Sequence, residues 1–153
     1  MTREEIKDFT ARISQTNRSG LVVISYEMML TYIRHAKEEL AEAPEVFVWN
    51  LKQAKSVLEE LMNALDFDYA EIANELMSLY LFIQKQLNSS IFKKEDVNLA
   101  SVENIINKLK VAFEKVAEED TTGPVMQNTS KLYVGLTYNK DMQSDITETK
   151  QEL

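Results

Sequence analysis

The chain has 153 residues, which suits a single domain because domains commonly contain about 100–200 residues. It has no cysteine, which excludes disulfides and thiolate metal sites, and its net charge of −8 at pH 7 argues against nucleic acid, whose phosphates require a basic surface. Only three glycines and two prolines are present, so the composition favours helix.

The first residues, "MTREEIKDF", are charged where a signal peptide would need an apolar run. No stretch approaches the roughly 18 consecutive apolar residues that indicate a membrane-spanning helix. We therefore expect a cytoplasmic protein that does not insert into a membrane.

Two helices are predicted in the first 40 residues. Helical spacing of apolar residues predicts a short helix over residues 3–16 and a longer one over residues 18–40. Asn17 is suited to the N-cap of the second helix, because its side chain can accept a backbone N–H of the first turn. The apolar residues of the short helix are Ile6, Phe9 and Ile13.

A third and a fourth helix are predicted around the segment "DFDYAE". Pro44 suits the first turn of the third helix, where its missing N–H costs nothing. Asp68 and Glu71 have the spacing of a capping box at the start of the fourth helix. The predicted core stripe of the third helix contains Phe47, Leu51, Ala54, Leu58, Leu61 and Leu65. That of the fourth contains Ile72, Leu76, Leu79, Ile83 and Leu87.

The segment "NSSIFKKED" predicts the next break, before a fifth helix that ends near Glu119. Its predicted stripe contains Val102, Ile105, Leu109, Ala112 and Val116. After "DTTGPV" the helical period stops, so residues 121–153 are predicted to be a flexible, irregular tail, with 132–138 a candidate docking segment. The predicted fold is all-α: residues 1–120 form an antiparallel up-down four-helix bundle with a short N-terminal capping helix.

His35 is the single histidine, so it is the only candidate for imidazole chemistry near neutral pH. A histidine phosphotransfer bundle also uses one helical histidine, but "HAKEEL" lacks the glycine that such domains favour shortly after it. We interpret His35 as a structural residue and keep phosphotransfer as an alternative that labelling by a phosphodonor would test. No other cluster predicts catalysis, so we expect a protein that is not an enzyme and that holds neither a metal nor another cofactor.

The second and fourth helices carry more apolar residues than a core-facing stripe requires. On a helical wheel the second helix is apolar over more than half its circumference, whereas a bundle helix needs a stripe of roughly 100°. Two interpretations remain open. The excess is buried permanently, for example in a structural helical oligomer, or it forms a groove for an amphipathic helix or extended segment of another protein.

Three segments of the chain together carry a recognisable pattern. In "LVVISYEMMLTYIRHAK" it contains Leu21, Tyr26, Glu27 and Leu30. In "NLKQAKSVLEELMNALD" it contains Ala54, Leu58, Glu60, Leu61, Leu65 and Asp66. In the following "ELMSLYLFIQKQL" it contains Leu76, Leu79, Tyr80, Phe82, Ile83 and Leu87. In this order the three segments resemble those of the flagellar secretion chaperone FliS family.

This resemblance implies a cytoplasmic chaperone that binds the C-terminal segment of flagellin, prevents premature polymerisation and assists delivery to the flagellar type III secretion apparatus, including its export gate. The chaperone would act as a monomer or homodimer. Combined with the wheel geometry, it assigns seven residues to the client grooves: Tyr26, Met29, Leu30, Ile33, Met77, Leu81 and Phe82. It assigns Ile6, Phe9 and Ile13 to a displaceable cap or a contact with the export gate.

Overall fold

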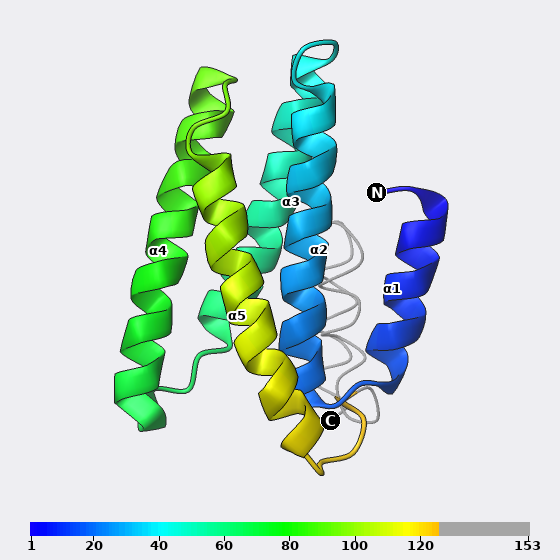
Figure 1. The fold of residues 1–153 in the computed structure, drawn as a ribbon, viewed down its shortest axis with the longest axis vertical. Coiled ribbons are helices and arrows are strands. Elements are labelled where there is room, and N and C mark those ends of the chain that lie inside the picture. Colours follow the sequence, from blue (N-terminus) through cyan, green and yellow to red (C-terminus); the bar gives the residue numbers. More distant parts are fainter. Residues whose placement is uncertain (126–153) are drawn as a thin grey trace, which may run out of the picture. The chain divides into compact units, whose positions relative to one another are not determined.

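The computed structural model describes residues 1–125, where all regular structure is helical (Figure 1). The elements are α1 (Arg3–Gln15), α2 (Arg18–Glu39), α3 (Pro44–Asn63), the short 3₁₀ helix η1 (Phe67–Tyr69), α4 (Ala70–Lys93) and α5 (Leu99–Glu119). The predicted all-α class is confirmed, whereas the antiparallel order of four helices stays a prediction. The candidate docking segment 132–138 lies outside the described residues.

The chain divides into two compact units, so the prediction of a single domain over residues 1–120 is left open. One unit contains Met1–Ile24 together with the chain from Lys110 onward, and the other contains Ser25–Leu109. The divisions fall within α2 and within α5. Over the described part of the chain, no helix combines the length and the apolar composition that crossing a bilayer requires.

Both helices at the start of the chain have side-chain caps. The Thr2 hydroxyl accepts the backbone N–H of Glu5 at 3.1 Å, and the Glu5 carboxylate accepts that of Thr2 at 2.8 Å, which completes a capping box for α1. At the start of α2, Asn17 Oδ1 accepts the backbone N–H of Gly20 at 2.7 Å. The predicted N-cap of the second helix is therefore confirmed.

The predicted capping box at the start of the fourth helix is wrong. Asp68 and Tyr69 belong to η1 instead, and the Asp66 carboxylate accepts the backbone N–H of Asp68 at 2.9 Å. α4 begins only at Ala70, and Tyr69 at its N-cap makes no side-chain capping bond. The capping carboxylate is therefore that of Asp66, two residues before Asp68, and it caps η1 rather than α4.

The break predicted at "NSSIFKKED" begins several residues too early, because α4 continues to Lys93. Ser90 is buried within the last turns of α4, and its hydroxyl accepts the backbone N–H of Val97 at 3.0 Å. The Asn98 side chain donates to Gln86 Oε1 at 3.0 Å. Ser90, one of the polar residues that predict a break, therefore lies inside α4, and together with Gln86 it holds the connection between α4 and α5.

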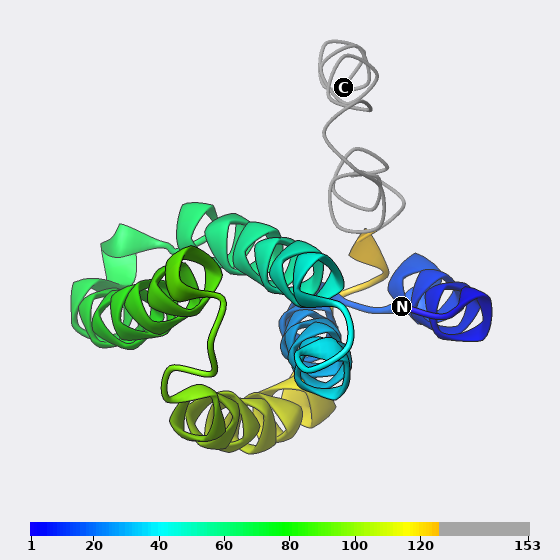
Figure 2. The ribbon, with the colours of Figure 1, turned by 90° about the horizontal axis from the view of Figure 1, so that it is seen from above.

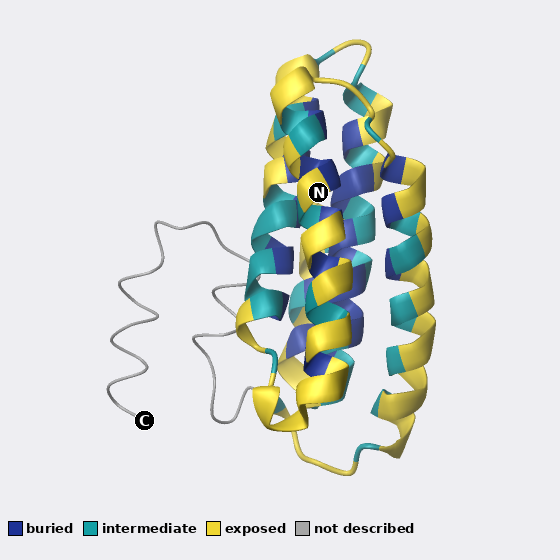
Figure 3. Cartoon of the chain, turned by 90° about the vertical axis from the view of Figure 1, so that its left-hand side faces the viewer, coloured by how far each residue is buried: buried dark blue, intermediate teal, exposed yellow. Residues whose placement is uncertain are grey.

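In the second unit, α2 contacts each of the three other helices. The pairs are Tyr26–Tyr80 with α4, Tyr32–Trp49 with α3 and Lys37–Glu103 with α5. α3 also packs closely against α4, and Figure 2 shows these two helices side by side. Exposed positions follow the outward faces of the helices (Figure 3). Because α2 has neighbours on several sides, an apolar surface over most of its circumference is what its position requires.

Candidate client-binding surface

The α2 residues predicted to line a client groove are mostly in the core. Tyr26, Met29 and Ile33 are completely buried, and Leu30 is half-buried. The expectation that these side chains face outward is corrected because α2 meets three helices in the second unit rather than one core face. A client therefore cannot contact Tyr26, Met29 or Ile33 while the second unit is folded.

The hydroxyl groups of Tyr26 and Tyr80 form a polar contact inside this core. They lie 2.5 Å apart, and both side chains are almost inaccessible to water. Burial raises the pKa of both hydroxyls above the ordinary value of 10.0, and the neighbouring Tyr80 raises that of Tyr26 further. This contact positions α2 on α4 and offers no group that titrates near neutral pH.

On α4, the structure exposes the residues that the wheel geometry places off the stripe. Leu81 is 49% exposed, Phe82 is 40% exposed and Met77 is half-buried. Adjacent positions on an α-helix differ by about 100°, so Leu81 and Phe82 point to two different sides of α4. Both side chains are accessible to a partner in the folded protein.

The predicted core stripe of α4 is partly wrong. Ile72 is 60% exposed and Leu79 is also exposed, although Ile83 and Leu87 are buried as predicted. The buried residues of α4 are Ala73, Tyr80, Ile83, Gln86, Leu87 and Ser90. Ser90 lies five full turns after Ile72 at about 100° per residue, so both are on one side of the helix, and this side is covered near the end of α4 but not in its first half.

The uncovered first half of this stripe belongs to an apolar surface that the sequence analysis missed. Ile72, Leu79 and Phe82 follow the spacing i, i+7, i+10 and so lie on one side of α4. We call these three residues the α4 face. η1, which contacts α4, exposes Phe67 and Tyr69 just before it. The i, i+7, i+10 spacing is visible in the sequence. The spacing alone does not show whether another helix buries these residues or leaves them exposed to solvent.

α1 presents one buried face and one exposed apolar residue. Phe9 and Ile13 are buried, and Ile6 is exposed. The Arg12 guanidinium lies 5.7 Å from the centre of the Phe9 ring and 3.6 Å from the Asp8 carboxylate. The predicted cap residues therefore include two that are covered in the folded chain.

His35 lies on α2 with its Nδ1 atom 3.6 Å from Glu38 Oε2, one helical turn further on. Its side chain is about four-fifths buried. The neighbouring carboxylate would repel an incoming phosphoryl group, which disfavours the phosphotransfer alternative.

The model of the family described as "Flagellar protein FliS" matches residues 3–120, a range that includes every helix of the described structure. A search of curated proteins finds no match to this chain. FliS proteins are flagellar export chaperones for flagellin. A match over more than three-quarters of the sequence shows that this chain belongs to the FliS family.

Proposed function

We propose that this protein binds the C-terminal segment of flagellin in the cytoplasm, keeps it from polymerising early and assists its delivery to the flagellar type III secretion apparatus. The observation that carries the proposal is the exposed apolar surface of α4 in a chain of the FliS family. Leu81, Phe82 and the half-buried Met77 contact the client in this proposal, and Ile72 and Leu79 extend the contact along the α4 face.

The strength of such a contact follows from the surface that it removes from water. Burial of apolar surface contributes about 25 cal/mol per Å², so several large side chains together give several kcal/mol. A disordered client loses conformational freedom as it binds, at a cost of about 2–5 kcal/mol. The remaining affinity holds the client and still permits its release at the export apparatus.

The buried groove candidates have a different part in this proposal. Tyr26 supports α4 through its contact with Tyr80, and Met29 and Ile33 are core residues rather than client contacts. The half-buried Leu30 contributes only the part of its side chain that reaches the surface.

α1 is the displaceable cap in this proposal. It has 13 residues, and isolated helices shorter than about 12–15 residues are marginally stable in water. Its stability therefore depends on the burial of Phe9 and Ile13. A client that occupies the surface covered by these two residues releases α1, whose exposed Ile6 is then available to the export gate.

Replacement of Leu81 and Phe82 together by aspartate is expected to weaken binding of the flagellin C-terminal segment about tenfold or more. The change removes two apolar contacts and brings two charges to the surface that the client must cover. Calorimetric titration with a synthetic flagellin segment measures the affinity, and circular dichroism measures the helix content. The helix content should stay unchanged, because both side chains are well exposed.

The matched control is Phe92→Asp, which introduces the same charge at a residue 88% exposed near the end of α4. This variant should bind the segment as the unaltered protein does. Equal affinity in the double variant and the unaltered protein would place the client on another surface.

A further inference from the structure

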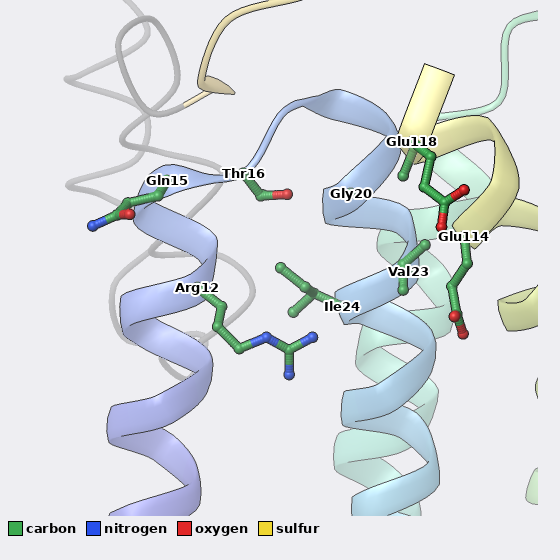
Figure 4. A pocket seen from close by; sticks show the side chains of 9 residues that line it. Arg12, Gln15, Thr16, Gly20, Val23, Ile24, Glu114 and Glu118 are labelled. Carbon is green, nitrogen blue, oxygen red and sulfur yellow. The ribbon is translucent and has the colours of Figure 1, made fainter. Parts of the chain in front are cut away.

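An open cavity of about 490 Å³ lies within the first unit, between the end of α1, the start of α2 and the end of α5 (Figure 4). This volume is within the roughly 300–1,000 Å³ of typical ligand pockets. Val23 and Ile24 on α2 line its apolar part. Arg12 projects from α1 on one side of them, and Glu114 and Glu118 of α5 lie on the other (Figure 4).

The chain that follows α5 is fixed to the edge of this cavity. The Asp120 carboxylate accepts the Ser19 hydroxyl at 2.7 Å, and the Asp120 carbonyl accepts the Asn17 side chain at 3.3 Å. The backbone N–H of Val125 then donates to the carbonyl of Thr16 at 3.0 Å, and Thr16 itself lines the cavity. The segment after Val125 therefore begins at the cavity.

That segment has the composition that the cavity requires. Residues 126–140, "MQNTSKLYVGLTYNK", contain two lysines and no acidic residue. The cavity is lined by two carboxylates, Glu114 and Glu118, and one cation, Arg12, and Glu114 also lies 3.9 Å from Lys110. Glu118 therefore offers the principal negative charge that Lys131 complements, and Lys131 is followed by alternating apolar residues. Lys131 is the sixth residue after Val125, a span of up to about 20 Å when extended. A segment tethered so closely has a high effective concentration at the cavity.

We propose that residues 131–136 of this chain dock in the cavity, with the Lys131 ammonium at Glu114 and Glu118 and with Leu132 and Val134 against Val23 and Ile24. An occupant of this cavity touches α1 on one wall and α2 and α5 on the other.

Cysteine cross-linking in the full chain tests the docking, because the chain contains no cysteine of its own. Ala117 lines the cavity, so Ala117→Cys is combined in turn with Asn128→Cys, Val134→Cys or Gln143→Cys. Docking predicts the fastest intramolecular disulfide formation with position 134. If the segment is only tethered and does not dock, the cross-linking rate should show no maximum at position 134. If disulfide-linked dimers form instead, the occupant of the cavity is a second copy of the chain. Either result overturns the proposal.

A charge exchange tests the assigned contact in the variant that combines Ala117→Cys with Val134→Cys. Glu118→Lys and Lys131→Glu should each slow cross-linking about fivefold, and their combination should restore the rate. The matched control is Glu119→Lys, at an exposed α5 residue that does not line the cavity, and it should leave the rate unchanged. Equal rates for Glu118→Lys and Glu119→Lys would overturn the ion pair.

Discussion

Replacement of Ile33 by aspartate is expected to unfold the second unit, at a cost of more than about 4 kcal/mol in the free energy of unfolding. Ile33 has no exposed surface, so the new carboxylate would be buried among apolar side chains without a partner. The packing contacts of the isoleucine are lost as well. Urea denaturation followed by circular dichroism measures the change, which should appear as a lower midpoint or as loss of the transition.

Two comparisons make this prediction specific. Ile33→Val removes one methylene and should cost only about 0.5–1.5 kcal/mol. Leu81→Asp introduces the same charge as Ile33→Asp, but at an exposed residue of α4, and should change the stability by no more than about 0.5 kcal/mol. If Ile33→Asp stays folded and loses only flagellin binding, Ile33 is a surface residue and the present arrangement of α2 is incorrect.

The buried tyrosine pair should give the second large effect. Tyr26→Phe leaves the Tyr80 hydroxyl without its 2.5 Å partner in a site closed to water, which costs about 1–3 kcal/mol. Removal of both hydroxyls in Tyr26→Phe/Tyr80→Phe should recover part of this cost, because the Tyr80 hydroxyl is then no longer buried without Tyr26 as its partner. Denaturant titrations of the unaltered protein, the two single variants and the double variant give the free energies of unfolding for a double-mutant cycle. Additive losses would show that the two hydroxyls do not interact.

Three buried tyrosines, including this pair, make the folded protein less stable at alkaline pH. Burial raises the pKa of Tyr26, Tyr32 and Tyr80 in the folded protein above the ordinary value of 10.0. Above about pH 10 the unfolded chain therefore loses phenolic protons that the folded chain retains, and folding stability falls as the pH rises. The slope approaches about 1.4 kcal/mol per pH unit for each such group.

A stability profile between pH 8 and 11.5 checks this direction. Tyr26→Phe/Tyr80→Phe should flatten the decline above pH 10, whereas Tyr69→Phe should not, since Tyr69 is exposed. A profile that falls equally steeply in the double variant would assign the alkaline loss to other groups.

The sequence predicts best where one face of a helix decides its position. The stripe of α3 is buried from Phe47 to Leu61, as its steps of three and four residues indicate. The Asn17 cap is also local, because it depends only on a side chain and a backbone group three residues away. Helix existence follows from composition and period, so the all-α class could be predicted without knowledge of any contact.

Long-range contacts decide what the sequence predicts poorly. The apolar excess of α2 gives no sign of whether neighbouring helices or a client cover it, and in the second unit three helices do so. Ile72 and Leu79 belong to the same helical period as Ile83, yet only Ile83 is buried. Tyr80 is buried against a partner 54 residues away, a contact that no local pattern encodes.

Trp49 gives this protein an internal spectroscopic probe. It is the chain's only tryptophan, it is half exposed on α3, and its ring meets Tyr32 edge-on with centroids 6.2 Å apart. Selective excitation of the indole therefore reports on the second unit alone, and a soluble quencher reaches it before any unfolding. Melting of the α2–α3 contact can then be followed in an unlabelled sample without a signal from the first unit.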